Sequence, residues 1–379
     1  MSIPASAASM TASSLEALTA SRALQGIGSA GFLAVNSALV RLVYPSGMLP
    51  RGIALTSSVV AASSVAGPPI AAVLLSWGDW HCLFAINITL GLLVVMLGWK
   101  VLPPSRPQRP TGPAADWRDG VLNALTFGLL FLGANLSGAV PNGNSNASTV
   151  ALAIAAMLIG MGAGAYYIGR QRRYEMPLFP IDLLRNSSLS MSVGVATTTY
   201  VGYTLSFVSL PFLMIEIWKF DAATAGLVLS AWPAGAIVGA PLSGLAMKRW
   251  SSNAVASCGL VLLGAGIACL ALLGTEASTE SAAWRLALCG IGFGLFLSPN
   301  IHLMVTGTPL RRAGAAGGIL GTARLAGQAA GGTLLAGICN KTGFSRPGWI
   351  LALWIPALVT AVAVVLSIIR GSNSGAANG

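Results

Sequence analysis

Two arginines lie inside segments that are otherwise apolar, and each is followed one helical turn later by a glutamine. Arg324 stands 12 residues after Arg312 and is followed by Gln328, whereas Arg22 is followed by Gln25. In a helix, Arg324 would lie roughly 18 Å along the axis from Arg312. A guanidinium at that depth in hydrocarbon must face a water-filled cavity or a partner. Arg324 is therefore a candidate functional residue, with a structural ion pair as the alternative.

Arg22 lies nearer the end of its apolar segment, at a depth of roughly 7 Å. A long side chain at that depth can reach the lipid headgroups. For Arg22 an interfacial position is thus an alternative to a functional one.

A third set of residues combines hydroxyl groups and aromatic rings. The run Thr197-Thr198-Thr199-Tyr200 is followed by Tyr203 and Phe207. Residues 200, 203 and 207 share one face of a helix, and aromatic faces attract cations. We expect Thr198, Tyr200, Tyr203 and Phe207 to line a substrate cavity, with ordinary helix packing as the alternative.

The composition excludes a water-soluble globular protein. Of 379 residues, 55% are hydrophobic and only 8% are charged, whereas a soluble domain carries about 25% charged residues. The 21 Lys and Arg against 10 Asp and Glu do not indicate a nucleic-acid partner, because the basic residues fall in loops. The five cysteines lie far apart, so we expect no metal site and no cofactor.

Apolar runs of about 20 residues predict membrane-spanning helices. The sequence predicts about eleven spans, near residues 22–43, 53–76, 82–102, 120–140, 149–169, 189–215, 222–246, 253–273, 284–306, 313–338 and 348–369. Residues 1–21 resemble the end of a further membrane helix rather than a cleaved signal peptide.

Alternating the loops by side of the membrane separates the basic residues. One side collects 15 of them, namely Arg41, Arg51, Lys100, Arg106, Arg109, Arg118, Arg170, Arg172, Arg173, Arg185, Lys248, Arg249, Arg311, Arg312 and Arg370. The other side keeps Lys219, Arg285, Lys341 and Arg346. The positive-inside rule makes the rich side cytoplasmic, which predicts a cytoplasmic C-terminus.

The chain contains a parallel internal repeat with an offset of 264 residues. The matching pairs are Gly26 and Gly290, Ile27 and Ile291, Gly28 and Gly292, Phe32 and Phe296, Leu33 and Leu297, and Asn36 and Asn300. Such repeats are common in transporters, whose substrate sites lie where the repeats meet. We therefore expect Asn36 and Asn300 to line the substrate cavity. Gly26-x-Gly28-x-x-Gly31 also fits a dinucleotide fingerprint, but without a preceding strand it predicts close helix packing instead.

Three motifs carry a resemblance to a known family: RALQGIG at 22–28, Gly67-Pro68-Pro69, and WHCLFAIN at 80–87. The glycine-rich segments after Gly290 and over 312–332 fit the same pattern. On these residues the chain resembles the fourteen-helix drug:proton antiporter branch of the major facilitator superfamily over nearly its whole length.

The resemblance implies an all-α polytopic bundle in three parts: an incomplete N-terminal helical half at 1–106, linker segments with two extra helices at 107–185, and a six-helix C-terminal half at 186–379. It assigns Arg22 and Gln25 to proton coupling, to which we add Arg324 and Gln328. Gly67, Pro68 and Pro69 would form the antiporter motif, a pliable helix seam, whereas a plain proline kink is the alternative.

The chain departs from the family pattern in several places. Nothing matches the family's first two helices, its acidic first-helix motif or the basic loop after helix two, so the chain looks N-terminally truncated. Ala71-Ala72 stands in place of a Gly-Gly pair, and Met247 stands where the family has an Asp.

The leading hypothesis is a secondary transporter in the bacterial inner membrane that exports lipophilic, cationic compounds against inward proton flow. It is not expected to be an enzyme, because no cluster of catalytic side chains lies at one depth. The alternatives are a proton-coupled metabolite importer of the same fold and a truncated chain without transport activity.

Overall fold

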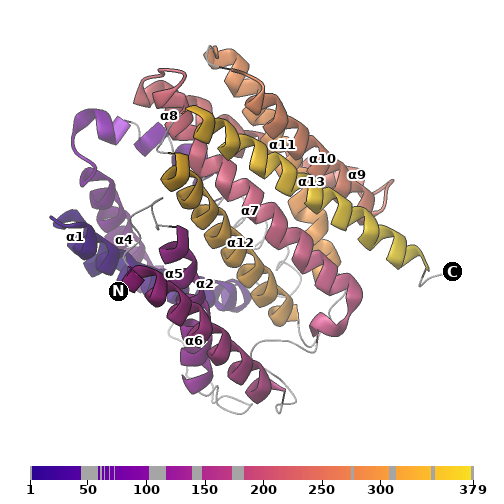
Figure 1. Ribbon diagram of the computed structural model, residues 1–379, viewed down its shortest axis with the longest axis horizontal. Coiled ribbons are helices and arrows are strands. Elements are labelled where there is room, and N and C mark those ends of the chain that lie inside the picture. The colour runs from indigo at the N-terminus through magenta and orange to yellow at the C-terminus, as the bar shows by residue number, and fades with distance from the viewer. Residues whose placement is uncertain are drawn as a thin grey trace. The chain divides into compact units, whose positions relative to one another are not determined.

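The computed structural model describes residues 2–43, 59, 62–63, 65–67, 69–71, 73–101, 117–138, 147–172, 183–274, 277–306, 313–342 and 346–376. Within these ranges every regular element is helical (Figure 1), as the sequence predicts. The chain divides into two compact units, residues 1–111 with 222–230, and residues 112–221 with 231–379.

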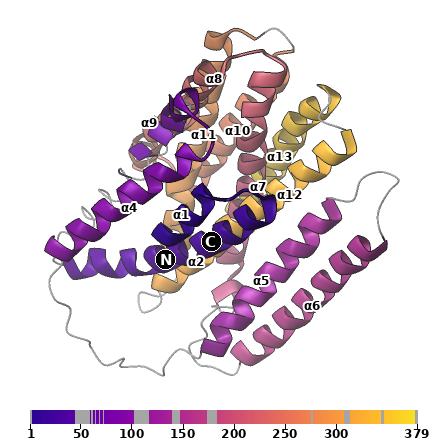
Figure 2. The same cartoon turned by 90° about the vertical axis from the view of Figure 1, so that its left-hand side faces the viewer.

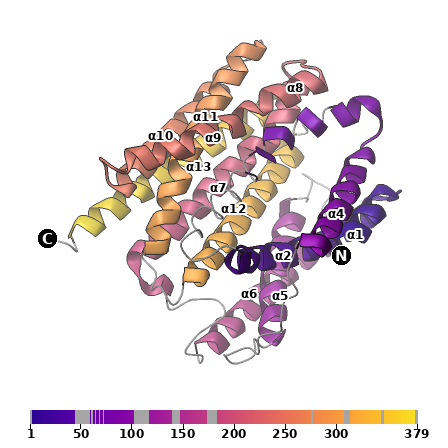
Figure 3. The ribbon, with the colours of Figure 1, turned by 180° about the vertical axis from the view of Figure 1, so that it is seen from behind.

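The described helices of the first unit are α1 (Ser2–Met10), α2 (Leu15–Val43), α4 (Cys82–Val101) and, from further along the chain, α8 (Ala222–Leu229). Helix α1 packs against α2 and α4 (Figure 3). The hydroxyl groups of Ser9 and Ser21 lie 2.8 Å apart, which joins α1 to α2. The predicted helix remnant at the start of the chain is therefore a separate helix that packs on the next one.

The second unit contains α5 (Trp117–Gly138), α6 (Ala147–Gln171), a short 3-10 helix (Leu183–Arg185), α7 (Ser187–Glu216), α9 (Ala231–Ala246), α10 (Ser252–Ala271), α11 (Thr279–Thr306), α12 (Ala313–Thr342) and α13 (Arg346–Ala376). Helix α11 packs between α9 and α10, while α7 packs against α12 and α13 (Figure 2).

Polar residues define where several of these helices begin. Asn186 accepts a hydrogen bond from the Ser188 backbone N–H at 3.0 Å before α7. Ser251 accepts one from Ala254 at 3.2 Å before α10, and Ser278 accepts one from Ser281 at 3.1 Å before α11. Each side chain satisfies a backbone donor that the first turn leaves free.

The helices coincide with the predicted spans, apart from the span near 53–76, which lies mostly outside the described residues. Among the described helices, seven are long and apolar enough to cross a membrane. The last helix is longer than its apolar run: α13 continues to Ala376, so Arg370, which follows the predicted span 348–369, lies inside the helix.

Exposed apolar side chains show which solvent these helices meet. Leu90, Met96 and Leu97 on α4 and Val365 and Ile368 on α13 are all more than half exposed. Rows of exposed apolar residues of this kind are costly in water and suited to lipid. The exposure therefore supports a polytopic membrane protein.

Glycines allow α11 to approach its two neighbours closely. A Cβ atom at Gly290 would lie 1.9 Å from the Trp232 carbonyl oxygen of α9, and one at Gly294 would lie 2.5 Å from the Ala236 oxygen. On the α10 side, a Cβ at Gly292 would lie 2.4 Å from the Leu263 nitrogen. Small residues at such crossings permit direct backbone contact between membrane helices.

The corresponding glycines of α2 do not show the expected close packing. No atom of a described neighbour lies within 4 Å of the Cβ position at Gly26 or Gly31, and both glycines are exposed. Gly26 is the repeat partner of Gly290, which is tightly packed. The prediction of close approach thus holds for the second copy and not for these two positions of the first.

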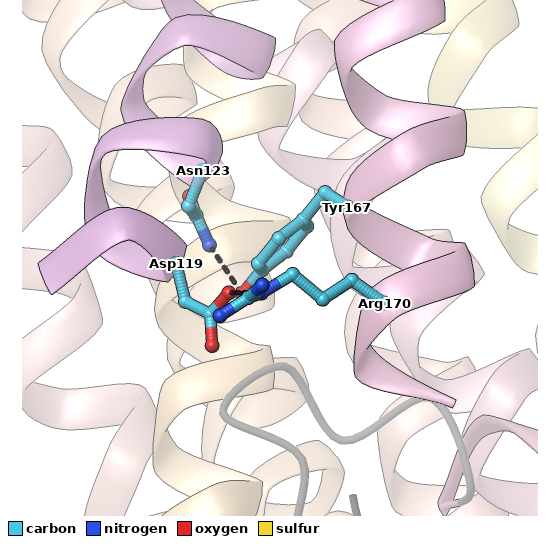
Figure 4. A network of polar contacts seen from close by, with 4 residues as sticks. All are labelled: Asp119, Asn123, Tyr167 and Arg170. Carbon is cyan, nitrogen blue, oxygen red and sulfur yellow. Dashed lines mark hydrogen bonds and ion pairs between the residues drawn. The ribbon is translucent and has the colours of Figure 1, made fainter. Parts of the chain in front are cut away.

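Helices α5 and α6 form an antiparallel pair joined by a polar network (Figure 4). Arg170 donates from Nε to Asp119 Oδ1 at 2.7 Å, and Asn123 donates from Nδ2 to the Tyr167 hydroxyl at 3.4 Å. The Asp119 side chain is 7% exposed and that of Arg170 is 26% exposed. Asp119 lies in the first turn of α5 and Arg170 in the last turn of α6. The ion pair therefore joins the two helices at the end opposite to the loop that connects them.

We expect Arg170→Gln to lower the midpoint of thermal unfolding more than Asp119→Asn does. The first change leaves a nearly buried carboxylate without its ion-pair partner, whereas the second leaves the guanidinium of Arg170, which is more exposed and can still be solvated. The double variant should recover part of the loss, with a coupling energy of about 1 kcal/mol. Thermal unfolding of the purified protein measures the cycle, and strictly additive losses would contradict the pairing.

Candidate functional site

Five aromatic side chains from three helices form one cluster, which we call the aromatic cluster: Tyr200, Tyr203 and Phe207 of α7, Trp232 of α9 and Phe293 of α11. Tyr203 is its centre, since its ring lies 4.8 Å from that of Phe293, 5.4 Å from Phe207, 5.6 Å from Trp232 and 6.4 Å from Tyr200. Tyr203 stacks on Phe207 and Phe293 and meets the other two edge-on. Both geometries are favourable for aromatic pairs.

Some polar groups around this cluster have a hydrogen-bond partner and one has none among the described residues. Thr197 and Thr199 donate to the backbone oxygens of Val193 and Val195 at 2.9 and 2.7 Å, so their hydroxyls are used within α7. Trp232 is 1% exposed, and among the described residues no acceptor lies within hydrogen-bond distance of its indole nitrogen. A buried indole N–H usually finds a partner, so this donor is free to bind one.

Arg324 and Gln328 lie where α12 crosses α7. A Cβ atom at Gly327 would lie 2.5 Å from the Thr197 oxygen and 2.7 Å from Tyr200 Cβ. Arg324 precedes Gly327 by three residues, so it lies within one helical turn of the contact between α12 and Tyr200. Arg324 is exposed and Gln328 is half-buried. The structure therefore brings Arg324 together with the aromatic cluster, which the spacing of the sequence does not reveal.

Arg22 and Gln25 form a separate group in the first unit. Arg22 donates to Gln25 Oε1 and lies over the Phe84 ring of α4, 5.8 Å from its centroid. Gln25 in turn donates to the Ser6 hydroxyl of α1 at 3.0 Å. The guanidinium is thus engaged by an amide and an aromatic face while its surface is exposed.

Two predicted groups lie at or beyond the limits of the described residues. Pro68 and the side chain of Asn36 are outside them, whereas Gly67 and Pro69 lie in helical turns. The antiporter motif and the first of the two repeated asparagines therefore stay predictions.

Asn300 does not line an accessible surface in this structure. It is 0% exposed, and its Oδ1 accepts a hydrogen bond from Arg370 at 2.8 Å. Here α13 supplies the donor for the amide oxygen, and a contact of Asn300 with substrate stays a prediction.

Sequence reasoning missed Phe293 and the part played by Trp232. Both face Tyr203, but they come from helices 30 to 90 residues further along the chain. The signal that could have found Phe293 is its place between Gly292 and Gly294, which pack on opposite neighbours and leave the side chain between them a third face.

Comparison with known proteins shows the family to which this chain belongs. Residues 1–173 and 193–377 match the Major Facilitator Superfamily. The chain is 38% identical over 357 residues to the uncharacterized transporter YebQ of Escherichia coli, which covers 94% of this chain and 76% of YebQ. It is 27% identical over 331 residues to the tetracenomycin C resistance and export protein of Streptomyces glaucescens, covering 87% of this chain and 60% of that protein.

A solved structure shares the fold. A crystal structure of a POT family transporter in complex with a thioalcohol conjugated peptide matches with a TM-score of 0.71 and 17% identity, covering 98% of this chain and 79% of that one. Identity at this level shows the fold alone. Together with the family match over almost the whole sequence, these findings establish that the chain belongs to the Major Facilitator Superfamily and is a membrane transporter rather than an enzyme.

Proposed function

We propose that this transporter exports amphipathic, cationic compounds in exchange for protons by alternating access, as a member of the fourteen-helix branch of its superfamily. The observation that carries the proposal is the packing of α12 against Tyr200 of the aromatic cluster, one helical turn from Arg324. Aromatic faces bind lipophilic cations, while a deep guanidinium is costly in a membrane and typical of a transport pathway. The resistance and export protein among its relatives supports the same direction of transport.

The coupling residues proposed are Arg324 and Gln328 in the second unit and Arg22 and Gln25 in the first. A fixed positive charge repels a cationic substrate, so Arg324 would favour release of the substrate when the site opens. The substrate surface is proposed to comprise Thr198 and the aromatic cluster. Asn300 is left out of this surface because its amide is bound to Arg370.

The proposed location is the bacterial plasma membrane, with the arginine-rich side and the C-terminus in the cytoplasm. An impermeant thiol reagent should fail to label a cysteine placed at Arg172 in intact cells and should label it in everted vesicles. The reverse pattern would contradict this orientation.

Everted vesicles test the direction and coupling of transport. With a proton gradient established and followed by acridine fluorescence, adding ethidium should release protons and restore the fluorescence, because each cation that enters the vesicle is exchanged for protons. An uncoupler should abolish ethidium accumulation. Accumulation that an uncoupler does not change would exclude proton exchange, and gradient-driven loss of ethidium from everted vesicles would favour the importer instead.

We expect Tyr203→Ala to raise the KM for ethidium roughly 3- to 30-fold, since a cation over an aromatic face gains about 0.5–2 kcal/mol. Tyr203 touches the other four rings of the cluster, so its loss also loosens them. Phe212→Ala is the matched control, because Phe212 lies on the same helix but stacks on Trp349, away from the cluster. An equal KM in both variants would remove the cluster from the substrate site.

A further inference from the structure

Arg370 is a charged side chain buried within the second unit. It is 1% exposed and donates to four side chains: Asn253 at 2.7 Å, Asn300 at 2.8 Å, Ser192 at 3.1 Å and Ser367 at 3.2 Å. We call these five residues the Arg370 network. The acceptors belong to α7, α10, α11 and α13, so one guanidinium joins four helices.

The network lies at one end of this helical unit. Ser192 and Asn253 follow the starts of α7 and α10, while Asn300 and Arg370 precede the ends of α11 and α13. These helices also contact one another, α13 with α7 and α10, and α10 with α11 (Figure 1).

The acceptors are themselves held in place. Asn253 donates from Nδ2 to the Ser367 backbone oxygen at 3.0 Å, and the hydroxyls of Ser257 and Ser367 lie 2.8 Å apart. Asn300 donates to Met304 Sδ at 3.7 Å. Because each partner has a second contact, the guanidinium binds a prearranged set of oxygens and loses little further freedom.

These four acceptors are uncharged amide and hydroxyl oxygens. Hydrogen bonds from a charged donor are each stronger than neutral ones, so the network is strong in sum.

The position of Asn300 links this network to transport. Asn300 directly follows Pro299, which lies inside α11. A proline in a helix removes one backbone hydrogen bond and permits bending. Phe293 of the aromatic cluster lies before the proline, and Asn300 lies after it. Arg370 therefore holds the part of α11 on the far side of the bend.

We propose that Arg370 is a positioning residue: it anchors α11 after Pro299 to α7, α10 and α13, so that bending at Pro299 moves the segment with Phe293 against a fixed base. The anchor itself rests on the transporter fold alone, whereas its effect on ethidium transport rests on the proposed function. The four hydrogen bonds of the Arg370 network go to residues outside the aromatic cluster, so we expect Arg370 to set the rate of the conformational step and not the affinity for substrate.

The first test measures ethidium transport by purified protein in liposomes, per amount of folded protein. Arg370→Gln should lower kcat about tenfold with KM unchanged, and Arg370→Lys, which keeps the charge but fewer donors, should be intermediate. Arg249→Gln, which changes an exposed arginine after α9, is the control and should match the wild type. Normal kcat in Arg370→Gln, or a change confined to KM, would overturn the proposal.

A double variant separates anchoring from general stabilisation. If Arg370 acts through the bend, Pro299→Ala alone should lower kcat, and adding Arg370→Gln should lower it little further. Multiplied losses in the double variant would show independent effects and overturn the link to Pro299.

The second test needs no substrate and so stands even if ethidium is not transported. Hydrogen–deuterium exchange of the full chain in nanodiscs should rise in Arg370→Gln within residues 300–306 and stay unchanged in the α9 segment 235–246. Unchanged exchange at 300–306, or a uniform rise across α9, α10 and α11, would contradict a local anchor.

Discussion

Replacing Arg324 with alanine is expected to abolish ethidium efflux while the protein still reaches the membrane in normal amount. The side chain of Arg324 is exposed. It makes no hydrogen bond or ion pair with the described residues, so its removal should not weaken the packing of α12. Its charge lies in the middle of α12, one turn before Gly327 packs on Tyr200, where only a wet pathway or a functional partner can stabilise it. Loss of the charge should therefore remove transport rather than folding.

The measurement compares ethidium efflux in cells with the amount of protein in purified membranes. Leu325→Ala is the matched control, because Leu325 is the next residue and is 59% exposed. Arg324→Lys should keep part of the activity, since it retains a positive charge at the same place. Wild-type efflux in Arg324→Ala would remove this residue from the coupling site.

Gly290→Val is expected to have the largest effect on folding. The added Cβ would lie 1.9 Å from the Trp232 carbonyl oxygen and 2.9 Å from the Ala236 nitrogen, both of which are backbone atoms of α9. Helix α11 cannot simply shift away, because Gly292 fixes it against α10 on another face. Overpacking of this kind costs roughly 1–3 kcal/mol or more.

Size-exclusion chromatography of detergent-extracted protein measures the loss as a fall in the monodisperse peak. Gly244→Val is the control: it makes the same change on α9, where no atom lies within 4 Å of the Cβ position. An undiminished peak for Gly290→Val would show that α9 and α11 do not pack as closely as described.

The positions of the helices follow from the sequence because membrane helices need long apolar runs, and these are local. The contacts between helices do not follow from it. The repeat marks Gly26 and Gly290 as equivalents, yet of the two only Gly290 has described atoms within 4 Å of its Cβ position. Those atoms belong to α9, a separate segment that the repeat does not specify.

For the candidate site too, the sequence predicts which residues share a helix face and does not predict the contacts between helices. The spacing of Tyr200, Tyr203 and Phe207 places them on one helix face, and the structure brings these rings together. Phe293 and Arg370 escaped prediction because their roles depend on partners from other helices. Asn253 and Asn300, two amides within apolar helices, are the signal that could have indicated a buried donor.

The ion pair between Asp119 and Arg170 has a consequence for biogenesis. Both residues lie at the open end of the α5–α6 pair, on the same side of the membrane. In the proposed orientation this end faces the cytoplasm, so neither charge has to cross the lipid during insertion. The two segments can then enter the bilayer as one hairpin that the ion pair closes on the side where the ribosome lies.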